Sequence, residues 1–233
     1  MISENINIVK EKIVSRCLKT GRSPEEVRII AVSKNTGLQL ITQALASGIH
    51  DLGENKAQEM SEKMHLLEGP INWHFLGHLQ RNKVKTVVGA AYCIHSVDSL
   101  RLAEEINMQA ARINHTQKIL LEVKTSDEVT KYGISSFDEL LEIASFCREA
   151  ANLELMGLMT MAPYSEDEKK IRKSFTDLCK LKVTLNQQGF NLSELSMGMT
   201  NDFEIAVEEG ATMVRVGTAI FGERDYSKSW REQ

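Results

Sequence analysis

The sequence is poor in the features that mark linkers, disulfide frameworks and metal-binding cysteine motifs. It has three prolines in 233 residues and no proline- or glycine-rich stretch, so nothing in it marks a boundary between domains. We therefore expect residues 1–233 to form a single domain. The four cysteines, Cys17, Cys93, Cys147 and Cys179, lie far apart, which favours small buried side chains in a reducing compartment.

Membrane proteins and nucleic-acid-binding proteins are also disfavoured by what is missing. No stretch approaches the roughly 20 apolar residues of a membrane helix. The N-terminal segment MISENINIVKEKIV carries charges among its apolar positions, unlike a signal peptide. The net charge is −4 and there is no long basic run, which disfavours a surface that binds nucleic acid. We expect a cytoplasmic protein that binds neither membranes nor nucleic acids.

Short apolar runs alternate with helical segments along the chain. The segments between the runs have helical periodicity, as in FDELLEIASFCREA from Phe137. This alternation predicts parallel βαβ units, and eight of them in 233 residues fit a (β/α)8 TIM barrel with an extra N-terminal helix. A doubly wound open sheet is the alternative, although it more often has fewer strands. The eight runs begin at Arg28, Ile49, Ile71, Ala91, Lys118, Leu153, Leu192 and Thr212.

In a barrel, the C-terminal ends of the strands carry the chemistry. Lys34 closes the first apolar run, AVSK, where it shares a face with Ile30 and Val32. An amine that bends over the barrel mouth can form an imine with a carbonyl compound. A lysine that simply reaches solvent is the alternative, and it is the more frequent case for a lysine in this position.

The last apolar run, TMVRVGTAIFG from Thr212, is expected to hold the eighth strand up to about Phe221. It places Arg215 among apolar residues, where a charge is costly unless it is paired. Gly217 and Thr218 follow: a glycine that lets a phosphate approach the backbone and a hydroxyl that can bond to it. A phosphate site and an internal ion pair of Arg215 with a carboxylate are equally compatible with this run.

The run before it adds a second feature that suits an anion. It ends in Ser196, Met199 and Thr200, after which Asn201 and Asp202 predict the capped start of a helix. The Thr200 hydroxyl and the free N–H groups of that helix start would face an anion next to the last strand. An ordinary capped helix that binds nothing is the alternative.

Two histidines raise the question of a metal site. His74 and His78 are four residues apart in WHFLGHLQRNK, a spacing that suits metal ligands on a helix. The segment is typical of a strand that runs into a loop, and no third ligand is evident near it. We therefore expect no metal, with His78 at the barrel mouth and His74 packed or at the surface. Asn55, after the second run, is expected to bind a ligand or to cap the next helix.

Six motifs in fixed order resemble the pyridoxal 5′-phosphate (PLP) homeostasis protein family. They are AVSK, LGEN-x-x-QE, WHFLGHLQ-x-NK, GLMTMAP, LSMGMT-x-D and VRVGTAIFG. Each is weak alone, whereas the ordered set from Ile30 to Gly222 is specific. The resemblance implies the barrel of the N-terminal domain of alanine racemase, with PLP held as an imine (Schiff base, or aldimine) on Lys34.

The resemblance places seven further residues around PLP. Asn55 would lie beside the ring, and Arg215 against the pyridine nitrogen. The phosphate would fall to Thr200, Gly217 and Thr218, and the remaining wall to Ser196 and Met199.

The chain departs from the family pattern in two places. Thr200 stands where the family usually has serine, which keeps the hydroxyl. Asn35-Thr36-Gly37 stands where many members have a lysine and a proline, which is expected to alter the loop over the cofactor.

These residues disfavour an efficient enzyme. An arginine at the pyridine nitrogen cannot accept a proton, so the ring would be a weak electron sink. Alanine racemase takes a second base, a tyrosine, from another domain, and we expect none here. The sequence therefore predicts a monomer without catalytic residues that binds PLP reversibly, buffers it or delivers it to PLP-dependent apoenzymes. A weakly active amino-acid racemase is the alternative; a Schiff-base aldolase acting on a sugar phosphate is less favoured.

Overall fold

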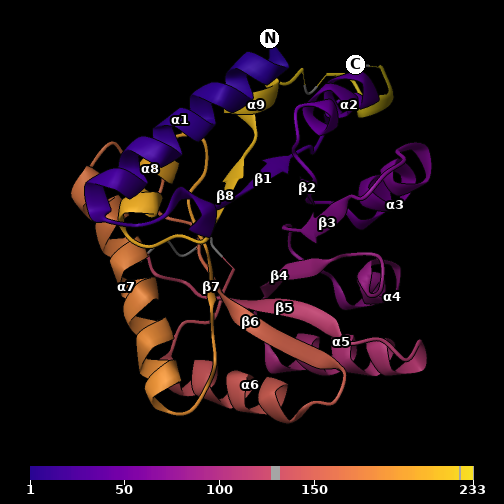
Figure 1. Ribbon diagram of the computed structural model, residues 1–233. Coiled ribbons are helices and arrows are strands. Elements are labelled where there is room, and N and C mark those ends of the chain that lie inside the picture. The colour runs from indigo at the N-terminus through magenta and orange to yellow at the C-terminus, as the bar shows by residue number, and fades with distance from the viewer. Residues whose placement is uncertain (127–131, 226, 233) are drawn as a thin grey trace.

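Eight parallel strands close into one barrel in the computed structural model, which describes residues 1–126, 132–225 and 227–232 (Figure 1). Each strand pairs with the next, and the last pairs back to the first, with Ile30 opposite Arg215. The predicted (β/α)8 barrel is therefore confirmed. The strands are β1 (Arg28–Val32), β2 (Asp51–Glu54), β3 (Asn72–Phe75), β4 (Cys93–Val97), β5 (Gln117–Glu122), β6 (Leu153–Met159), β7 (Glu194–Ser196) and β8 (Met213–Val216).

Helices form the outer layer around the strands (Figure 1). None of the described helices is long and apolar enough to cross a membrane. The α-helices are α1 (Ile2–Thr20), α2 (Leu38–Ala46), α3 (Ala57–Leu66), α4 (Val84–Val87), α5 (Leu100–Arg112), α6 (Phe137–Glu149), α7 (Glu168–Gln187), α8 (Phe203–Glu208) and α9 (Thr218–Phe221). Short 3-10 helices span Pro24–Glu26, Arg81–Lys83 and Trp230–Glu232.

The extra N-terminal helix is present as α1. Its buried residues fall at helical spacing on one face and are Ile2, Ile6, Val9, Ile13 and Cys17. The helix packs in the outer layer against α8 and α9 (Figure 1). Ion pairs from Arg16 to Glu204 and Glu208, both at 2.7 Å, fasten it to α8. The N-terminal helix therefore lies beside the last two βα units of the barrel.

The eighth strand is shorter than predicted. It ends at Val216, and the expectation that it extends to about Phe221 is wrong. The chain turns at Gly217, whose carbonyl accepts the Phe221 N–H at 2.9 Å, and Thr218–Phe221 form a helical turn. An apolar run does not by itself distinguish a strand from a buried helical turn.

Alternation along the strands separates the inside of the barrel from its outer core. Ile30, Cys93, Leu120, Met159 and Met213 form the inner cluster. Their chain neighbours, such as Ala31 and Ile94, pack against the helices instead. Lys34 continues the inner face of Ile30 and Val32, as predicted, and so reaches the barrel mouth. All four cysteines are free thiols.

Candidate functional site

A pocket of about 710 Å³ opens at the C-terminal ends of the strands. Lys34 enters it two residues after β1, Asn55 directly after β2, and Arg215 from within β8. Seven of the eight predicted site residues line this mouth pocket: Lys34, Asn55, Met199, Thr200, Arg215, Gly217 and Thr218. The fold thus brings together residues spread over most of the chain.

Arg215 is the buried cation of the mouth pocket, with 5% of its surface exposed. Its Nη1 donates to Ser196 Oγ at 2.7 Å, and its Nη2 donates to the Thr160 carbonyl at 2.8 Å. Both acceptors are neutral, unlike the carboxylate of the ion-pair alternative. Burial lowers the pKa of Arg215 to about 10, against the opposing effect of the Asp202 and Glu122 charges. The guanidinium remains cationic at neutral pH.

Ser196, the eighth predicted residue, lies outside the lining of the mouth pocket. Its side chain is fully buried, and its hydroxyl contacts Arg215 Nη1. The same hydroxyl lies 2.9 Å from His95 Nδ1. Ser196 therefore supports Arg215 from behind.

The backbone on both sides of Lys34 is held by a buried ion cluster. Lys63 Nζ, which is fully buried, donates to the Ser33 carbonyl at 2.6 Å. The Asn35 N–H donates to Glu59 Oε1 at 2.6 Å, and Lys63 pairs with that same oxygen at 2.7 Å. Lys63 also pairs with Glu54 at 2.8 Å. Asn35, part of the departure from the family pattern, adopts φ 50°, a conformation that asparagine tolerates.

The rim of the pocket beside β8 carries a second arginine, Arg224. Its Nη2 donates to the Val32 carbonyl at 2.7 Å, whereas its buried Nε has no hydrogen-bond partner among the residues that the structure describes. A Cβ on Gly217 would clash with this guanidinium, so glycine is needed for the close approach. Arg224 was not predicted, because it follows α9 in a segment without strand or helix periodicity.

The loop between β7 and α8 forms the neighbouring wall. The Thr200 hydroxyl accepts the Ala219 N–H at 3.3 Å, which ties this loop to α9. Helix α8 begins after Asp202, as predicted, but the Asp202 carboxylate does not cap its N–H groups. It accepts the Met199 N–H at 2.5 Å instead. Asp202 therefore shapes the loop that presents Met199 and Thr200.

The two histidines of the WHFLGHLQ motif separate in space. His78 lies at the mouth side, 3.4 Å from Asp98 and stacked on Tyr132 with ring centroids 4.0 Å apart. His74 is fully buried inside the barrel, as the packed alternative predicted. It lies beside Cys93 and His95, and ligand atoms of the three residues lie within 4.8 Å of one another. This cluster could not be predicted from the sequence, because its members come from two different strands, β3 and β4.

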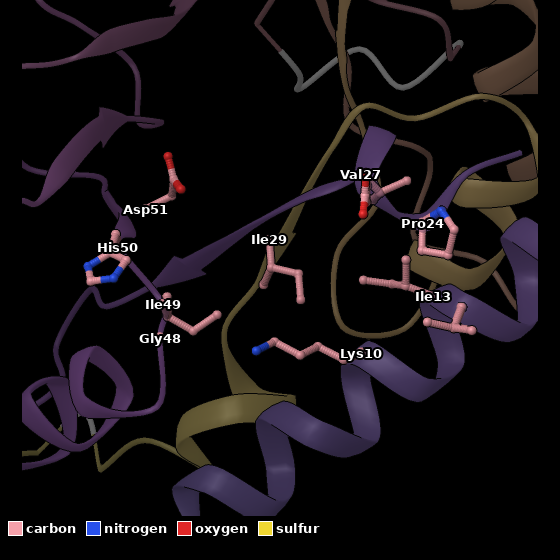
Figure 2. Close-up of a pocket in the computed structure, with 11 residues that line it drawn as sticks. Lys10, Ile13, Pro24, Val27, Ile29, Gly48, Ile49, His50 and Asp51 are labelled. Atoms are coloured by element: carbon pink, nitrogen blue, oxygen red, sulfur yellow. The ribbon is translucent and has the colours of Figure 1, made fainter.

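A second cavity, of about 350 Å³, lies at the N-terminal ends of β1 and β2, opposite the mouth pocket. Figure 2 shows the residues that line it. Ile13 of α1 and Ile29 and Ile49 near the starts of β1 and β2 give it apolar walls, and Asp51 is among its polar residues. Lys10 extends from α1 toward Gly48 and Ile49 (Figure 2). None of the eight predicted site residues lines this lower cavity.

Comparison with known proteins agrees with this architecture. Residues 10–225 match the family model described as alanine racemase, N-terminal domain. An alanine racemase of Clostridium difficile 630 shares the fold with a TM-score of 0.74 at 15% identity, and the match covers 99% of this chain and 59% of that one. The fold and the mouth pocket thus define a barrel of the alanine racemase N-terminal class.

Proteins of nearly the same length are more similar. They include two proteins named pyridoxal phosphate homeostasis protein. The one from Aquifex aeolicus (strain VF5) is 39% identical, over 96% of this chain and 98% of the relative. The one from Escherichia coli (strain K12) is 38% identical, over 97% and 98%. The structure of PipY from Synechococcus elongatus PCC7942 with PLP bound has a TM-score of 0.84 at 33% identity, covering 95% and 100%. The chain belongs to the pyridoxal phosphate homeostasis protein family.

Proposed function

We propose that this protein binds PLP in the mouth pocket and serves intracellular PLP homeostasis by holding the cofactor reversibly. The observation that carries the proposal is the convergence of Lys34, Arg215 and Arg224 on one pocket. A relative of known structure is described as binding PLP, and close relatives are named for PLP homeostasis. In this proposal residues 1–233 act as one PLP-binding domain, and the protein is a monomer. Four free thiols support a cytoplasmic location.

The residues of the pocket fit PLP, which combines a dianionic phosphate, an aldehyde and a pyridine ring. Arg224 offers a buried Nε that has no partner among the described residues, and the missing side chain at Gly217 lets its guanidinium lie against the backbone there. Arg215 supplies a second cation whose own hydrogen bonds go to neutral groups. Cationic donors of this kind suit a phosphate and a ring nitrogen.

Each end of PLP then has its own set of residues. Thr200, Gly217 and Thr218, together with Arg224, would hold the phosphate. Arg215 would face the pyridine nitrogen, which it can only donate to. Asn55 and Met199 would lie against the ring, and Ser196 would act through Arg215.

The Lys34 amine would bond covalently to the aldehyde carbon. When bound, PLP supplies a reactive aldehyde that an amine can capture and a second amine can release. The ion cluster of Lys63 and Glu59 fixes the backbone around Lys34, so that the amine is presented from a rigid strand end. Transfer to an apoenzyme would need only Lys34 and an incoming lysine.

Borohydride reduction tests the assignment of Lys34. Holo-protein is reduced and digested, and the peptides are analysed by mass spectrometry. We expect a phosphopyridoxyl adduct on Lys34, and loss of the visible absorbance band in Lys34→Ala. Lys56→Ala, which removes an exposed lysine near the pocket, is the matched control and should keep the band. An adduct mainly on another lysine would overturn the assignment.

Analytical ultracentrifugation tests the proposed oligomeric state. A single sedimenting species of monomer mass would support the monomer.

A weakly active amino-acid racemase is the second candidate function. The alanine racemase fold supports it only as an analogy, because structures at about this similarity share the fold alone. Turnover of amino acids by holo-protein separates this candidate from the binding protein.

A further inference from the structure

A row of buried polar side chains crosses the inside of the barrel behind the mouth pocket. His74 Nε2 lies 3.0 Å from Asp51 Oδ1, and His74 Nδ1 lies 2.8 Å from His95 Nε2. His95 Nδ1 lies 2.9 Å from Ser196 Oγ, which accepts from Arg215 Nη1 at 2.7 Å. We call these five hydrogen-bonded residues, from Asp51 to Arg215, the barrel chain.

The barrel chain joins the two ends of the barrel. Asp51 stands at the start of β2 and belongs to the lower cavity, where it is labelled in Figure 2. Arg215 lines the mouth pocket. The histidines and Ser196 between them are fully buried. A contact at the lower end is therefore connected by consecutive hydrogen bonds to the residue that would face the pyridine nitrogen.

Both ends of the barrel chain require its hydrogen bonds to be donated in one consistent order. An ionised Asp51 can only accept, so His74 donates from Nε2 and is left with Nδ1 as an acceptor. His95 must then donate from Nε2 and accept at Nδ1. At the other end Arg215 can only donate, so Ser196 accepts from it and gives its own proton to His95. One set of tautomers satisfies every member of the chain.

The charge states required for this arrangement agree with the surroundings. Burial lowers the pKa of His95 well below its usual value, and the neighbouring His74 and Arg215 act in the same direction. Burial also lowers the pKa of His74, although Asp51 opposes it. Burial opposes ionisation of Asp51, but the bond from His74 and the charge of Arg28 hold its pKa below the usual value. The histidines are thus neutral and Asp51 is ionised.

We infer that Asp51, His74 and His95 are positioning residues for Arg215, and that the acceptor-only carboxylate of Asp51 fixes the orientation of the Ser196 hydroxyl on which Arg215 rests. The expected effect on PLP affinity rests on the proposed PLP site. The positions of the protons in the barrel chain do not. With the hydroxyl fixed, its lone pair faces Arg215 Nη1 and the guanidinium keeps one orientation. The two hydrogen bonds of the Arg215 guanidinium go to neutral oxygens, Ser196 Oγ and the Thr160 carbonyl, so its orientation depends on how the Ser196 hydroxyl is turned.

Asp51→Asn tests the direction of the chain, because an amide can donate as well as accept. NMR of apo-protein labelled at the histidine ring nitrogens reads the tautomers without any PLP. We expect wild-type His74 and His95 to be neutral and protonated at Nε2, and the variant to populate the Nδ1-protonated forms. Asp138→Asn, which removes an exposed carboxylate far from the chain, should leave the tautomers unchanged.

PLP titration tests the effect on Arg215. Asp51→Asn should raise the dissociation constant about three- to tenfold, the value of one uncharged hydrogen bond, with Asp138→Asn at wild-type affinity. Two substitutions at His95 show which ring nitrogen is responsible for the effect on PLP affinity. His95→Asn keeps an acceptor in the Nδ1 position for Ser196 and should bind PLP better than His95→Gln, which places its amide at the Nε2 position.

Three results would overturn the inference. The first is a wild-type His95 protonated at Nδ1 in the apo-protein. The second is unchanged PLP affinity in folded Asp51→Asn and His95→Gln. The third is stoichiometric uptake of Zn²⁺ by His74, Cys93 and His95, since a metal would occupy the nitrogens that the chain uses. If the wild type binds no PLP but its histidine tautomers are as expected, the proposed function is wrong, whereas the proton direction inferred for the barrel chain is confirmed.

Discussion

The guanidinium of Arg224 rests directly on the backbone of Gly217, and a Cβ at that position would clash with its Nη2. Arg224 also donates to the Val32 carbonyl at 2.7 Å. It therefore links the end of β1, two residues before Lys34, to Gly217, which directly follows the strand that carries Arg215. The absence of a side chain at Gly217 is what lets a cation reach the rim of the mouth pocket.

Gly217→Ala is expected to displace Arg224 without unfolding the barrel, because the clash is with the end of a flexible side chain. Loss of one charged hydrogen bond to the phosphate would weaken PLP binding by about 1.5–3 kcal/mol, or roughly 10- to 150-fold. Titration of apo-protein measures this. Arg224→Gln should cost a similar amount, and the double variant should cost little more than either one. Additive losses would show that the two residues act separately.

The architecture was readable from the sequence because it depends on repeated local patterns. Eight apolar runs separated by helical segments are enough to indicate a barrel, and alternation places Lys34 on the inner face with Ile30. The error at Phe221 has the same origin: hydropathy alone does not show that the chain turns at Gly217.

The residues that support the site could not be predicted from local sequence patterns. His74, His95 and Ser196 come from β3, β4 and β7, and closure of the barrel is what brings them together in the hydrogen-bonded barrel chain. Lys63 looks like any lysine on an amphipathic helix, although it is fully buried on Glu54 and Glu59. Such pairings depend on register and closure between distant strands, which local periodicity does not determine.

Lys63→Met should destabilise the protein strongly. The substitution leaves the carboxylates of Glu54 and Glu59 without their cation inside the protein, a loss of about 3–5 kcal/mol for a broken buried pair. It also removes the bond to the Ser33 carbonyl beside Lys34. Urea denaturation at neutral pH measures the free energy of unfolding. Lys56→Met, at an exposed position on the same side of the barrel, is the control; equal stability of the two variants would contradict the prediction.

Glu122 should make the apo-protein less stable as the pH rises. Burial raises the pKa of this carboxyl to about 7, helped by the Asp98 charge and opposed by Arg215. The folded state then binds more protons than the unfolded state between about pH 4.5 and 7, so stability falls across that window. The difference of about 2.5 pKa values corresponds to about 3 kcal/mol.

Glu122→Gln removes this titrating group and tests the assignment. The free energy of unfolding of the variant should fall less than that of the wild type between pH 4.5 and 7. The exposed Glu149→Gln should follow the wild type. Parallel pH profiles for wild type and Glu122→Gln would show that the carboxyl ionises normally.

Amino-acid turnover would depend on the bases that the mouth pocket offers. Arg215 stays protonated at neutral pH, so it cannot accept a proton from the ring or the substrate. Racemisation needs two bases on opposite faces of the substrate carbon. Among the described tyrosines only Tyr164 lines the mouth pocket, and 94% of its surface is exposed. A side chain so open to solvent is poorly placed to exchange a proton at a fixed atom.

We therefore expect no amino-acid turnover at the usual enzyme scale of about 1–1,000 per second. Holo-protein is incubated with common L-amino acids, the enantiomers are separated by chiral chromatography, and a PLP-depleted apoenzyme is assayed for reactivation in parallel. Reactivation without racemisation is the expected outcome, because release of PLP needs only Lys34 and an incoming amine. Turnover in that range, abolished in Tyr164→Phe but kept in Tyr132→Phe, would identify the missing base and make the protein a racemase.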